Sequence, residues 1–437
     1  MIWPLAGIAA AFVLSGCFRM SADELYSLPR ASEEYIRLQV QIDAVLESGA
    51  EYSPPTGGPN RRSVQVKDLD GDGVDEALAF FTVAGSESPL KIHIFRKYED
   101  DYQNAAIIEG AGSAIESVRY VDMNGDGVSE IVVGWQMSTA LQHMTIYSLS
   151  GLQNVRIAGA DYKNIAVCDL NGDGTDDVVA VRLATAETPG EAESFTLMDD
   201  GEVVRSVARL SDGMDTVARI ISGHLRDGSP AVFVDGKAGS FTITDVFVYA
   251  EGLVNISVGA ESGYASDTER AMSLYCSDID KDGAVEAPAA VPLLQQSETT
   301  YYEIDWYAYD AAGGRELALS TYHNNSDGWY IIIPPSWRGR FTVRREDLAP
   351  GERTVIFSYI YKPDGEAPMF EDCLKIYTLS GDNKDERSGM PDRFEILSEG
   401  NAIYAGQLLP GSGVYGPADT PEAVADNFRR IYSEWIN

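Results

Sequence analysis

The chain has 437 residues, of which 44% are hydrophobic, so it can bury a sizeable core, and one large domain explains this length better than three domains of average size. Its net charge of −35 at pH 7 excludes electrostatic binding to nucleic acid or to an anionic membrane surface. The four cysteines predict no disulfide framework, because an odd number of thiols is left after Cys17.

The first residues form an apolar segment from 3 to 14 that is too short for an ordinary membrane span. It runs into Leu14-Ser15-Gly16-Cys17, which resembles the lipobox of bacterial lipoproteins. The resemblance implies that residues 1–17 are a lipoprotein signal peptide and that Cys17 carries the lipid. The mature protein would then be exported and held on the outer face of the bacterial cell membrane by this anchor alone. A plain secretory signal or a buried helix is the alternative.

Residues 18–59 are predicted to form a tether followed by one helix over 32–48. Ser32 can cap this helix and Gly49 can end it. Its apolar residues recur at helical spacing and fall on one face. They are Tyr35, Leu38, Ile42 and Val45. We expect this face to cover the body of the protein, and binding to a partner is the alternative.

Four copies of a nine-residue acidic motif follow, each with side-chain oxygens at positions 1, 3, 5 and 9 and glycine at position 6. We name them loop 1 (68–76), loop 2 (122–130), loop 3 (169–177) and loop 4 (278–286). Alternate residues can direct several oxygens to one point if the chain turns sharply, and glycine permits that turn. Ligand sets made of oxygen alone favour Ca²⁺ over zinc or copper.

In each loop, the expected calcium ligands are the side chains at positions 1, 3, 5 and 9 and the carbonyl group at position 7. They are Asp68, Asp70, Asp72, Val74 and Glu76; Asp122, Asn124, Asp126, Val128 and Glu130; Asp169, Asn171, Asp173, Thr175 and Asp177; and Asp278, Asp280, Asp282, Ala284 and Glu286. We expect the strength of the sites to follow the number of carboxylates, which is highest in loops 1 and 4.

The loops differ from an EF-hand, which needs a bidentate glutamate at position 12 and two flanking helices. Here position 12 holds Ala79, Val133, Ala180 and Ala289. Short apolar stretches typical of strands flank each loop instead, such as residues 118–121 and 131–135 around loop 2. The acid at position 9 is therefore expected to replace the EF-hand's twelfth residue.

The first three loops recur at intervals of roughly 50 residues, and about twice that interval separates loop 3 from loop 4. A degenerate copy without acids at positions 1 and 9 lies in the gap, at residues 223–231. A sixth copy, degenerate in the same way, is found at residues 323–331. Both copies are expected to be poor calcium sites.

Each repeat has room for four short strands, the pattern of a propeller blade. In the second repeat these are residues 117–121, 130–135, 142–149 and 155–159, and later strands are predicted at 354–361, 373–379 and 393–397. The sequence therefore predicts an all-β fold: a β-propeller over residues 60–410 with six or seven four-stranded blades, seven being favoured, and short flanking helices. Closing the ring would pair a late strand with residues 63–66.

These loops resemble the FG-GAP/VCBS-type repeats of integrin-alpha-like β-propellers, in which the motif Asp-x-Asp-x-Asp-Gly-x-x-Asp/Glu binds Ca²⁺ between the first two strands of a blade. The resemblance covers roughly residues 60–410 and implies about four calcium sites. It implies no single activity, because members include adhesion modules and glycan-associated proteins.

Beyond the propeller, residues 411–437 are predicted to hold a helix that starts at Thr420 and Pro421, runs to about Trp435 and packs on the propeller.

Catalytic motifs of the common hydrolase, metalloprotease and phosphate-binding types are absent from the sequence, so no catalytic residue is predicted. We expect a non-catalytic module that binds an extracellular protein or a glycan. The alternative is a calcium-dependent polysaccharide lyase or glycosidase on a propeller. The binding surface is expected opposite the calcium loops, on segments 84–90, 184–193, 236–240 and 295–300.

Overall fold

The computed structural model describes residues 33–99, 101–149, 154–259, 262–296, 298–362, 367–411 and 420–432. Over these residues the protein is an all-β structure of antiparallel strands with a few short helices, as the sequence predicts. The signal peptide, Cys17 and Ser32 lie outside the described residues, and the predictions made for them stay predictions. In the described part of the chain, no helix is both long and apolar enough to cross a membrane.

The strands form six sheets that follow one another along the chain. Sheet 1 contains β1 (Ala50–Tyr52), β2 (Val64–Lys67), β3 (Glu76–Val83), β4 (Leu90–Tyr98) and β5 (Asp101–Gly110). Sheet 2 contains β6 (Ala114–Val121), β7 (Glu130–Gln136), β8 (Gln142–Ser148) and β9 (Val155–Tyr162). Sheet 3 contains β10 (Asn164–Cys168), β11 (Asp177–Arg182), β12 (Glu191–Leu197) and β13 (Val203–Arg209).

The second half of the chain continues the pattern with more variation. Sheet 4 contains β14 (Met214–His224), β15 (Pro230–Ala238), β16 (Phe241–Tyr249) and β17 (Leu253–Asn255). Sheet 5 contains β18 (Glu286–Pro292), β19 (Tyr302–Tyr309), β20 (Arg315–Asn324), β21 (Trp329–Ile333) and β27 (Phe428–Arg430). Sheet 6 contains β22 (Phe341–Ala349), β23 (Glu352–Tyr361), β24 (Met369–Ser380), β25 (Phe394–Glu399) and β26 (Ala402–Leu408). The short helices η2 (Ser266–Thr268) and α3 (Lys384–Ser388) lie between strands.

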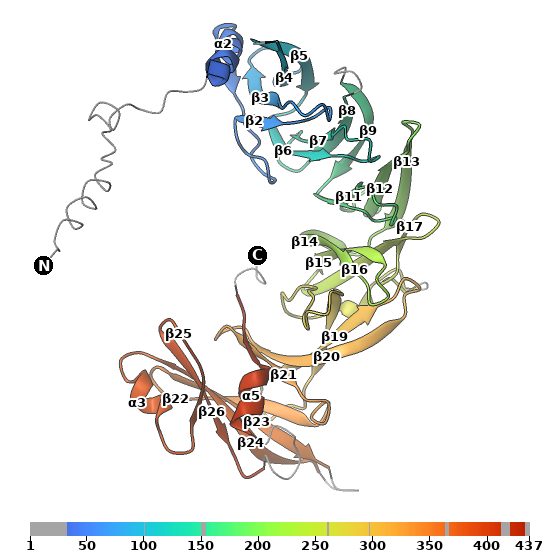
Figure 1. Cartoon of the computed structure of the whole chain (residues 1–437). Helices are drawn as coiled ribbons and strands as arrows, with labels where there is room; N and C mark the ends of the chain where they lie inside the picture. The colour runs from blue at the N-terminus through green and yellow to red at the C-terminus, as the bar shows by residue number, and fades with distance from the viewer. Residues whose placement is uncertain are drawn as a thin grey trace, which may run out of the picture.

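Consecutive sheets pack face to face along an arc (Figure 1). Buried apolar residues between sheets 1 and 2 include Phe80 and Val133, and a separate cluster between sheets 2 and 3 includes Val132 and Val178. Further clusters fill the spaces between sheets 3 and 4, sheets 4 and 5, and sheets 5 and 6. Because inner strands such as β7 and β11 are buried on both faces, they are continuous apolar runs rather than alternating ones.

The four strands predicted in the second repeat are confirmed as β6 to β9, and the three later ones as β23, β24 and β25. The preference for seven blades finds no support among the described residues, which form six sheets. The expected closing pair is also not formed there, because β2 pairs only with β3 and the late strand β27 pairs with β21.

A helix covers the face of sheet 1 that a closed ring would present to the last sheet. This helix, α2 (Glu33–Glu47), contributes the buried residues Leu38 and Ile42. They pack in one cluster with Phe81 and Phe95 of sheet 1. Sheet 1 is thus buried on both faces without the pairing predicted at residues 63–66, because α2 removes the apolar surface that closure would have removed.

The helix itself agrees with its prediction except at one position. It ends before Gly49, which has a φ of 99° that favours glycine, and Val45 is part of the cluster with Leu38 and Ile42. Tyr35, however, is 58% exposed. The apolar stripe of α2 is therefore one turn shorter than the sequence predicts.

The C-terminal helix is shorter than predicted. The side chain of Thr420 accepts a hydrogen bond from the Ala423 N–H at 3.1 Å, and α5 (Pro421–Asn427) follows this cap. It ends at Asn427 instead of running to about Trp435, and the chain continues as β27. The reason is the burial of Phe428, whose ring lies 5.5 Å from Trp329 and 5.2 Å from Tyr404 between ring centres.

Candidate metal centres

Loop 1 joins β2 to β3, loop 2 joins β6 to β7 and loop 3 joins β10 to β11, so each lies between two paired strands, as predicted. Loop 4 leads into β18 and is closed by a bridge between Ser277 and Glu286. Neighbouring loops touch: the Ser129 N–H of loop 2 donates to the Leu69 carbonyl of loop 1 at 2.8 Å. A Cβ atom on Gly71 would lie 2.7 Å from the Gly127 carbonyl oxygen, so the contact requires glycine there. The loops therefore lie along one rim of the arc.

The carboxylate at position 1 closes each loop by accepting hydrogen bonds from backbone N–H groups. Asp68 accepts from Gly71 at 2.8 Å and from Gly73 at 3.0 Å, and loops 2 and 3 repeat this pattern. In loop 4, Lys281 replaces the glycine at position 4 and adopts a φ of 65°. The carboxylate at position 5 accepts from the N–H of position 7, at 2.8 or 2.9 Å in all four loops. The shared register predicted from the sequence therefore gives a shared geometry.

The acid at position 9 is the first residue of the strand after the loop and is buried in all four loops. One of its oxygens accepts the N–H of position 2, at 2.9 Å between Glu76 and Leu69 and at 3.0 Å between Glu286 and Ile279. Glu130 and Asp177 make the same bond. The other oxygen of Glu76 and of Glu286 is buried without a hydrogen-bond partner. A buried carboxylate oxygen without a partner is costly, and a bound cation would supply that partner.

Two groups of acids converge closely enough to hold a metal ion. Their carboxylate oxygens lie within 4.8 Å of one another. The groups are Asp68, Asp70 and Glu76 in loop 1, and Asp278, Asp280 and Asp282 in loop 4. Burial and the neighbouring acids Asp280, Asp282 and Asp278 raise the pKa of Glu286 to about 8. Loops 1 and 4 thus have the donor set and the unsatisfied oxygen that a hard cation requires.

Loops 2 and 3 have an asparagine at position 3, and its amide changes the local electrostatics. Asn124 donates to Asp126 at 3.2 Å, and Asn171 donates to Asp173 at 2.7 Å. In loop 3 the hydroxyl group of Thr196 also donates to Asp177. These two loops therefore satisfy more of their carboxylate oxygens from within the protein than loop 4 does.

Sequence reasoning missed one residue at these centres, Arg96 of β4. Its Nη2 atom lies 2.7 Å from a carboxylate oxygen of Asp70 and 2.7 Å from one of Asp72. Its Nε atom is 3.9 Å from the unpartnered oxygen of Glu76. Hydrogen bonding from Arg96 is the main cause that lowers the pKa of Asp72. Only the pairing register of β3 and β4 connects Arg96 with loop 1, and that register is not visible in the motif.

The degenerate copy at residues 223–231 lies between β14 and β15, the position that its register predicts. The Val285 N–H of loop 4 donates to the His224 carbonyl at 2.9 Å, matching the bond between loops 2 and 1. Asp227 accepts from the Ser229 and Ala311 N–H groups at 3.0 and 2.9 Å. This aspartate is therefore engaged with backbone groups.

The prediction of a sixth, degenerate copy of the loop at residues 323–331 is wrong. These residues form the hairpin between β20 and β21, inside sheet 5. Asp327 is buried there and forms an ion pair with Arg353. The resemblance arose from an Asn-Ser-Asp-Gly turn, which is a common hairpin sequence.

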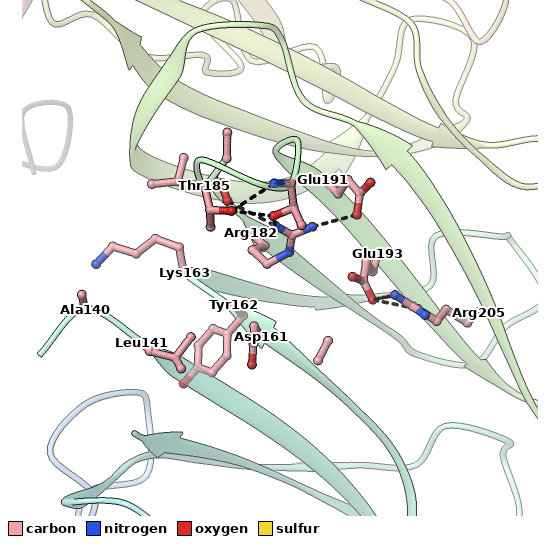
Figure 2. A pocket seen from close by; sticks show the side chains of 14 residues that line it. Ala140, Leu141, Asp161, Tyr162, Lys163, Arg182, Thr185, Glu191, Glu193 and Arg205 are labelled. Carbon is pink, nitrogen blue, oxygen red and sulfur yellow. Dashed lines mark hydrogen bonds and ion pairs between the residues drawn. The ribbon is translucent and has the colours of Figure 1, made fainter. Parts of the chain in front are cut away.

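The opposite rim carries the connections from the strand after each loop to the next strand of its sheet. Those at 84–90, 184–193, 236–240 and 295–300 join β3 to β4, β11 to β12, β15 to β16 and β18 to β19. A cavity of about 600 Å³ opens beside the connection between β11 and β12 (Figure 2). It is walled by Tyr162 and Lys163 and by two ion pairs, Arg182 with Glu191 at 2.9 Å and Arg205 with Glu193 at 2.8 Å.

Three cysteines lie in the described part of the chain as free thiols. Cys168, Cys276 and Cys373 form no disulfide in the described part of the chain. Cys276 and Cys373 are buried, and burial is the first cause that raises the pKa of each thiol. They are packing residues and not reactive groups.

No family model and no curated protein matches the chain. Among solved structures, it is similar to a rhamnogalacturonan lyase, YesW, with 14% identity, a TM-score of 0.29, and coverage of 73% of this chain and 68% of that one. It is also similar to a putative 6-phosphogluconolactonase from Bacteroides fragilis, with 12% identity, a TM-score of 0.26 and coverage of 72% and 84%. A periplasmic gluconolactonase from Pseudomonas aeruginosa has 9% identity, a TM-score of 0.27 and coverage of 73% and 90%. Similarity this low carries no argument about activity.

Proposed function

We propose that this chain is a non-catalytic binding module whose fold is stabilised by calcium. The observation that carries the proposal is the rim of acidic loops, in which Glu76 and Glu286 each bury a carboxylate oxygen without a hydrogen-bond partner. In loop 1, oxygens of Asp68, Asp70 and Glu76 lie within 4.8 Å of one another, and in loop 4 the same is true of Asp278, Asp280 and Asp282. Calcium would be held by the oxygens at positions 1, 3, 5 and 9 and by the position-7 carbonyl, and its charge would offset the cost of burying these acids.

The sheets are proposed to be blades of a β-propeller. Three features support this: three of the sheets have four strands and three have five, each joins to the next in chain order, and a separate apolar core lies between each consecutive pair. Six blades correspond to the six sheets of the described residues. The cover that α2 gives to sheet 1 favours an arc with a capped end over a ring closed by strand pairing.

The ligand is proposed to bind on the rim opposite the calcium loops. The cavity beside β11 and β12 combines the aromatic ring of Tyr162, the apolar side chains of Leu141 and Leu183, and charges of both signs. Such a mixture suits a glycan or a protein surface. The neighbouring turns differ in length and composition, which lets recognition vary without a cost to the sheets.

The module is also proposed to be exported and anchored through a lipid on Cys17, on the strength of the lipobox-like sequence Leu14-Ser15-Gly16-Cys17. Stable attachment needs more than one acyl chain, which the diacylglyceryl group of a lipoprotein supplies. Replacing Cys17 with alanine should release the protein from the membrane fraction. Metabolic lipid labelling of that variant at the wild-type level would contradict the anchor.

Calcium removal is the decisive experiment for the fold. The soluble protein, from Phe18 onward, should lose thermal stability in EDTA and regain it on addition of calcium, and calorimetry should detect bound calcium. Extracellular sites have dissociation constants of about 0.1 to 1 mM, so millimolar calcium is required. An unchanged melting temperature together with the absence of a binding heat would rule out calcium stabilisation.

A glycan and peptide array probed in calcium tests the binding role. Replacing residues 185–189 with a Gly-Ser turn should abolish any binding that the array detects, while calcium-dependent melting stays unchanged. Full affinity in that variant would show that the ligand does not bind at this cavity.

A further inference from the structure

Loops 1 and 4 carry the same number of carboxylates, but different residues face them from the strand that pairs with the strand after the loop. In sheet 5, the register pairs Glu286 directly with Ala308. In sheets 1, 2 and 3 the corresponding ladders end with the pairs Ala77 with Phe95, Ile131 with Tyr147 and Val178 with Phe195. One step further along each register, the residues opposite position 9 are Arg96, Ser148 and Thr196. The four equivalent positions thus hold arginine, serine, threonine and alanine.

The arginine brings a positive charge into loop 1. Its guanidinium group lies 2.7 Å from both Asp70 and Asp72, whose oxygens are expected calcium ligands. It also approaches Glu76 at 3.9 Å. Because Arg96 belongs to β4, in the same sheet, the charge is supplied by the folded chain itself and is present whenever the sheet is formed.

Loop 4 has no equivalent charge opposite Glu286 on β19. The side chain of Ala308 cannot supply a cation or a hydrogen bond, and one oxygen of the fully buried Glu286 lacks a partner. Asp278, Asp280 and Asp282 add three carboxylates within 4.8 Å of one another. Loop 4 is therefore the centre at which the acids depend most on a cation from solution.

We propose that Arg96 is a built-in counter-cation that competes with calcium for loop 1. The proposal rests on the proposed calcium function of the loops. Calcium must displace the guanidinium group from Asp70 and Asp72 before these oxygens can bind it. Loop 1 therefore binds calcium more weakly than loop 4 although both have four acids, and it stays ordered without calcium. The number of carboxylates alone does not set the order of the sites.

The test reads each loop separately. Hydrogen-exchange protection of the peptides that contain each loop, followed as calcium is added, gives one midpoint per loop. The midpoint of loop 1 should lie at a calcium concentration about tenfold higher than that of loop 4. Arg96→Ser introduces the residue that loop 2 has at this position. It should lower the loop 1 midpoint by about the same factor and make loop 1 exchange faster in EDTA.

A reciprocal variant and a control complete the design. Ser148→Arg places the guanidinium group opposite Glu130 and should raise the loop 2 midpoint while leaving loops 1 and 4 unchanged. Arg345→Ser removes an arginine of sheet 6 that pairs with Asp347 at 3.2 Å, and it should change no midpoint.

The outcomes separate this proposal from the calcium function. If loops 2 to 4 respond to calcium and both Arg96→Ser and Ser148→Arg leave every midpoint in place, Arg96 is not a competitor and the calcium function stands. If Arg96→Ser fails to fold, the loop 2 midpoint of Ser148→Arg tests the proposal on its own. A wild-type protein in which loops 2 to 4 gain no protection from calcium overturns the calcium function and the proposal together.

Discussion

Two buried aspartates of sheet 4 fix the irregular segment that leads from β17 to loop 4. Asp235 accepts hydrogen bonds from Thr244 at 2.5 Å and from Arg270 at 2.9 Å, and both charged side chains are fully buried. The thiol of Cys276 lies 3.0 Å from the same carboxylate. Asp245 accepts the backbone N–H of Ser211 at 2.7 Å. Arg270 and Cys276 belong to this segment, so their contacts with Asp235 hold it against sheet 4. Asp245 acts on the segment through Ser211, whose hydroxyl group donates to Asp245 and accepts the Ala265 N–H at 3.1 Å.

Breaking the Asp235–Arg270 pair should be strongly destabilising. Arg270→Met leaves the buried charge of Asp235 without its partner and should lower the free energy of unfolding by about 3 to 5 kcal/mol. The double variant Asp235→Asn with Arg270→Met should recover part of that loss. Urea unfolding in calcium measures both. A double variant as unstable as the sum of its single variants would show that the pair is not coupled.

Asp245 should make stability depend on pH. Burial raises its pKa from 3.8 to about 6, against the opposing hydrogen bonds from Ser211. Below pH 3.8 the carboxyl group is protonated in both the folded and the unfolded state. Between pH 3.8 and 6 the unfolded state ionises while the folded state keeps the proton, so stability falls as pH rises through this range. Above pH 6 the loss is constant, at most about 3 kcal/mol for a shift of this size. Asp245→Asn should therefore gain stability relative to the wild type between pH 4 and 7.

Urea unfolding at several pH values, with wild type and variant compared at each, checks this expectation. The two proteins share every other carboxylate, those of loops 1 to 4 included, so the contribution of these groups cancels in the difference. A difference that stays constant from pH 4 to pH 7 would show that the carboxyl group does not titrate in this window.

At the scale of the element, loop 4 and the degenerate copy at residues 223–231 can be compared by removing the aspartate at position 5 from each. Asp282→Ala removes a converging carboxylate from loop 4. In calcium at ten times the dissociation constant it should cost about 1.4 kcal/mol, the linkage contribution of one site. Asp227→Ala removes the aspartate at the same position of the degenerate copy, which accepts hydrogen bonds from the Ser229 and Ala311 N–H groups. Its effect on melting should be the same in calcium and in EDTA.

Melting curves of both variants, with and without EDTA, give the comparison. Equal calcium-dependent losses at Asp282 and Asp227 would contradict the distinction between loop and turn.

The loops and the strands beside them were predictable because both depend on residues close in sequence. The ligand register of loop 2 and the strands β6 to β9 follow from local turns and apolar runs. Arg96 was not predictable, because its place at loop 1 depends on how β4 pairs with β3. The end of α5 at Asn427 also depends on distant residues, since Phe428 packs on Trp329 and Tyr404. The place of Arg96 and the end of α5 are both set by tertiary packing.

At the scale of the whole molecule, α2 should be a structural part of the arc. Ile42 is 2% exposed and packs on sheet 1, whereas Val40 on the same helix is 59% exposed. Ile42→Ala should lower the free energy of unfolding by about 2 to 5 kcal/mol. Val40→Ala should change it by no more than about 0.5 kcal/mol. Equal effects in chemical unfolding would mean that the contact of α2 with sheet 1 does not contribute to stability.

The separate apolar cores between consecutive sheets make the arc a linear array, in which each unit is held mainly by its two neighbours. In such an array, the free energy of folding is close to a sum of unit terms and nearest-neighbour interface terms. An internal sheet stabilises two interfaces, and a terminal sheet stabilises one. By giving sheet 1 a second interface, α2 raises the resistance of the N-terminal end to fraying toward that of an internal unit.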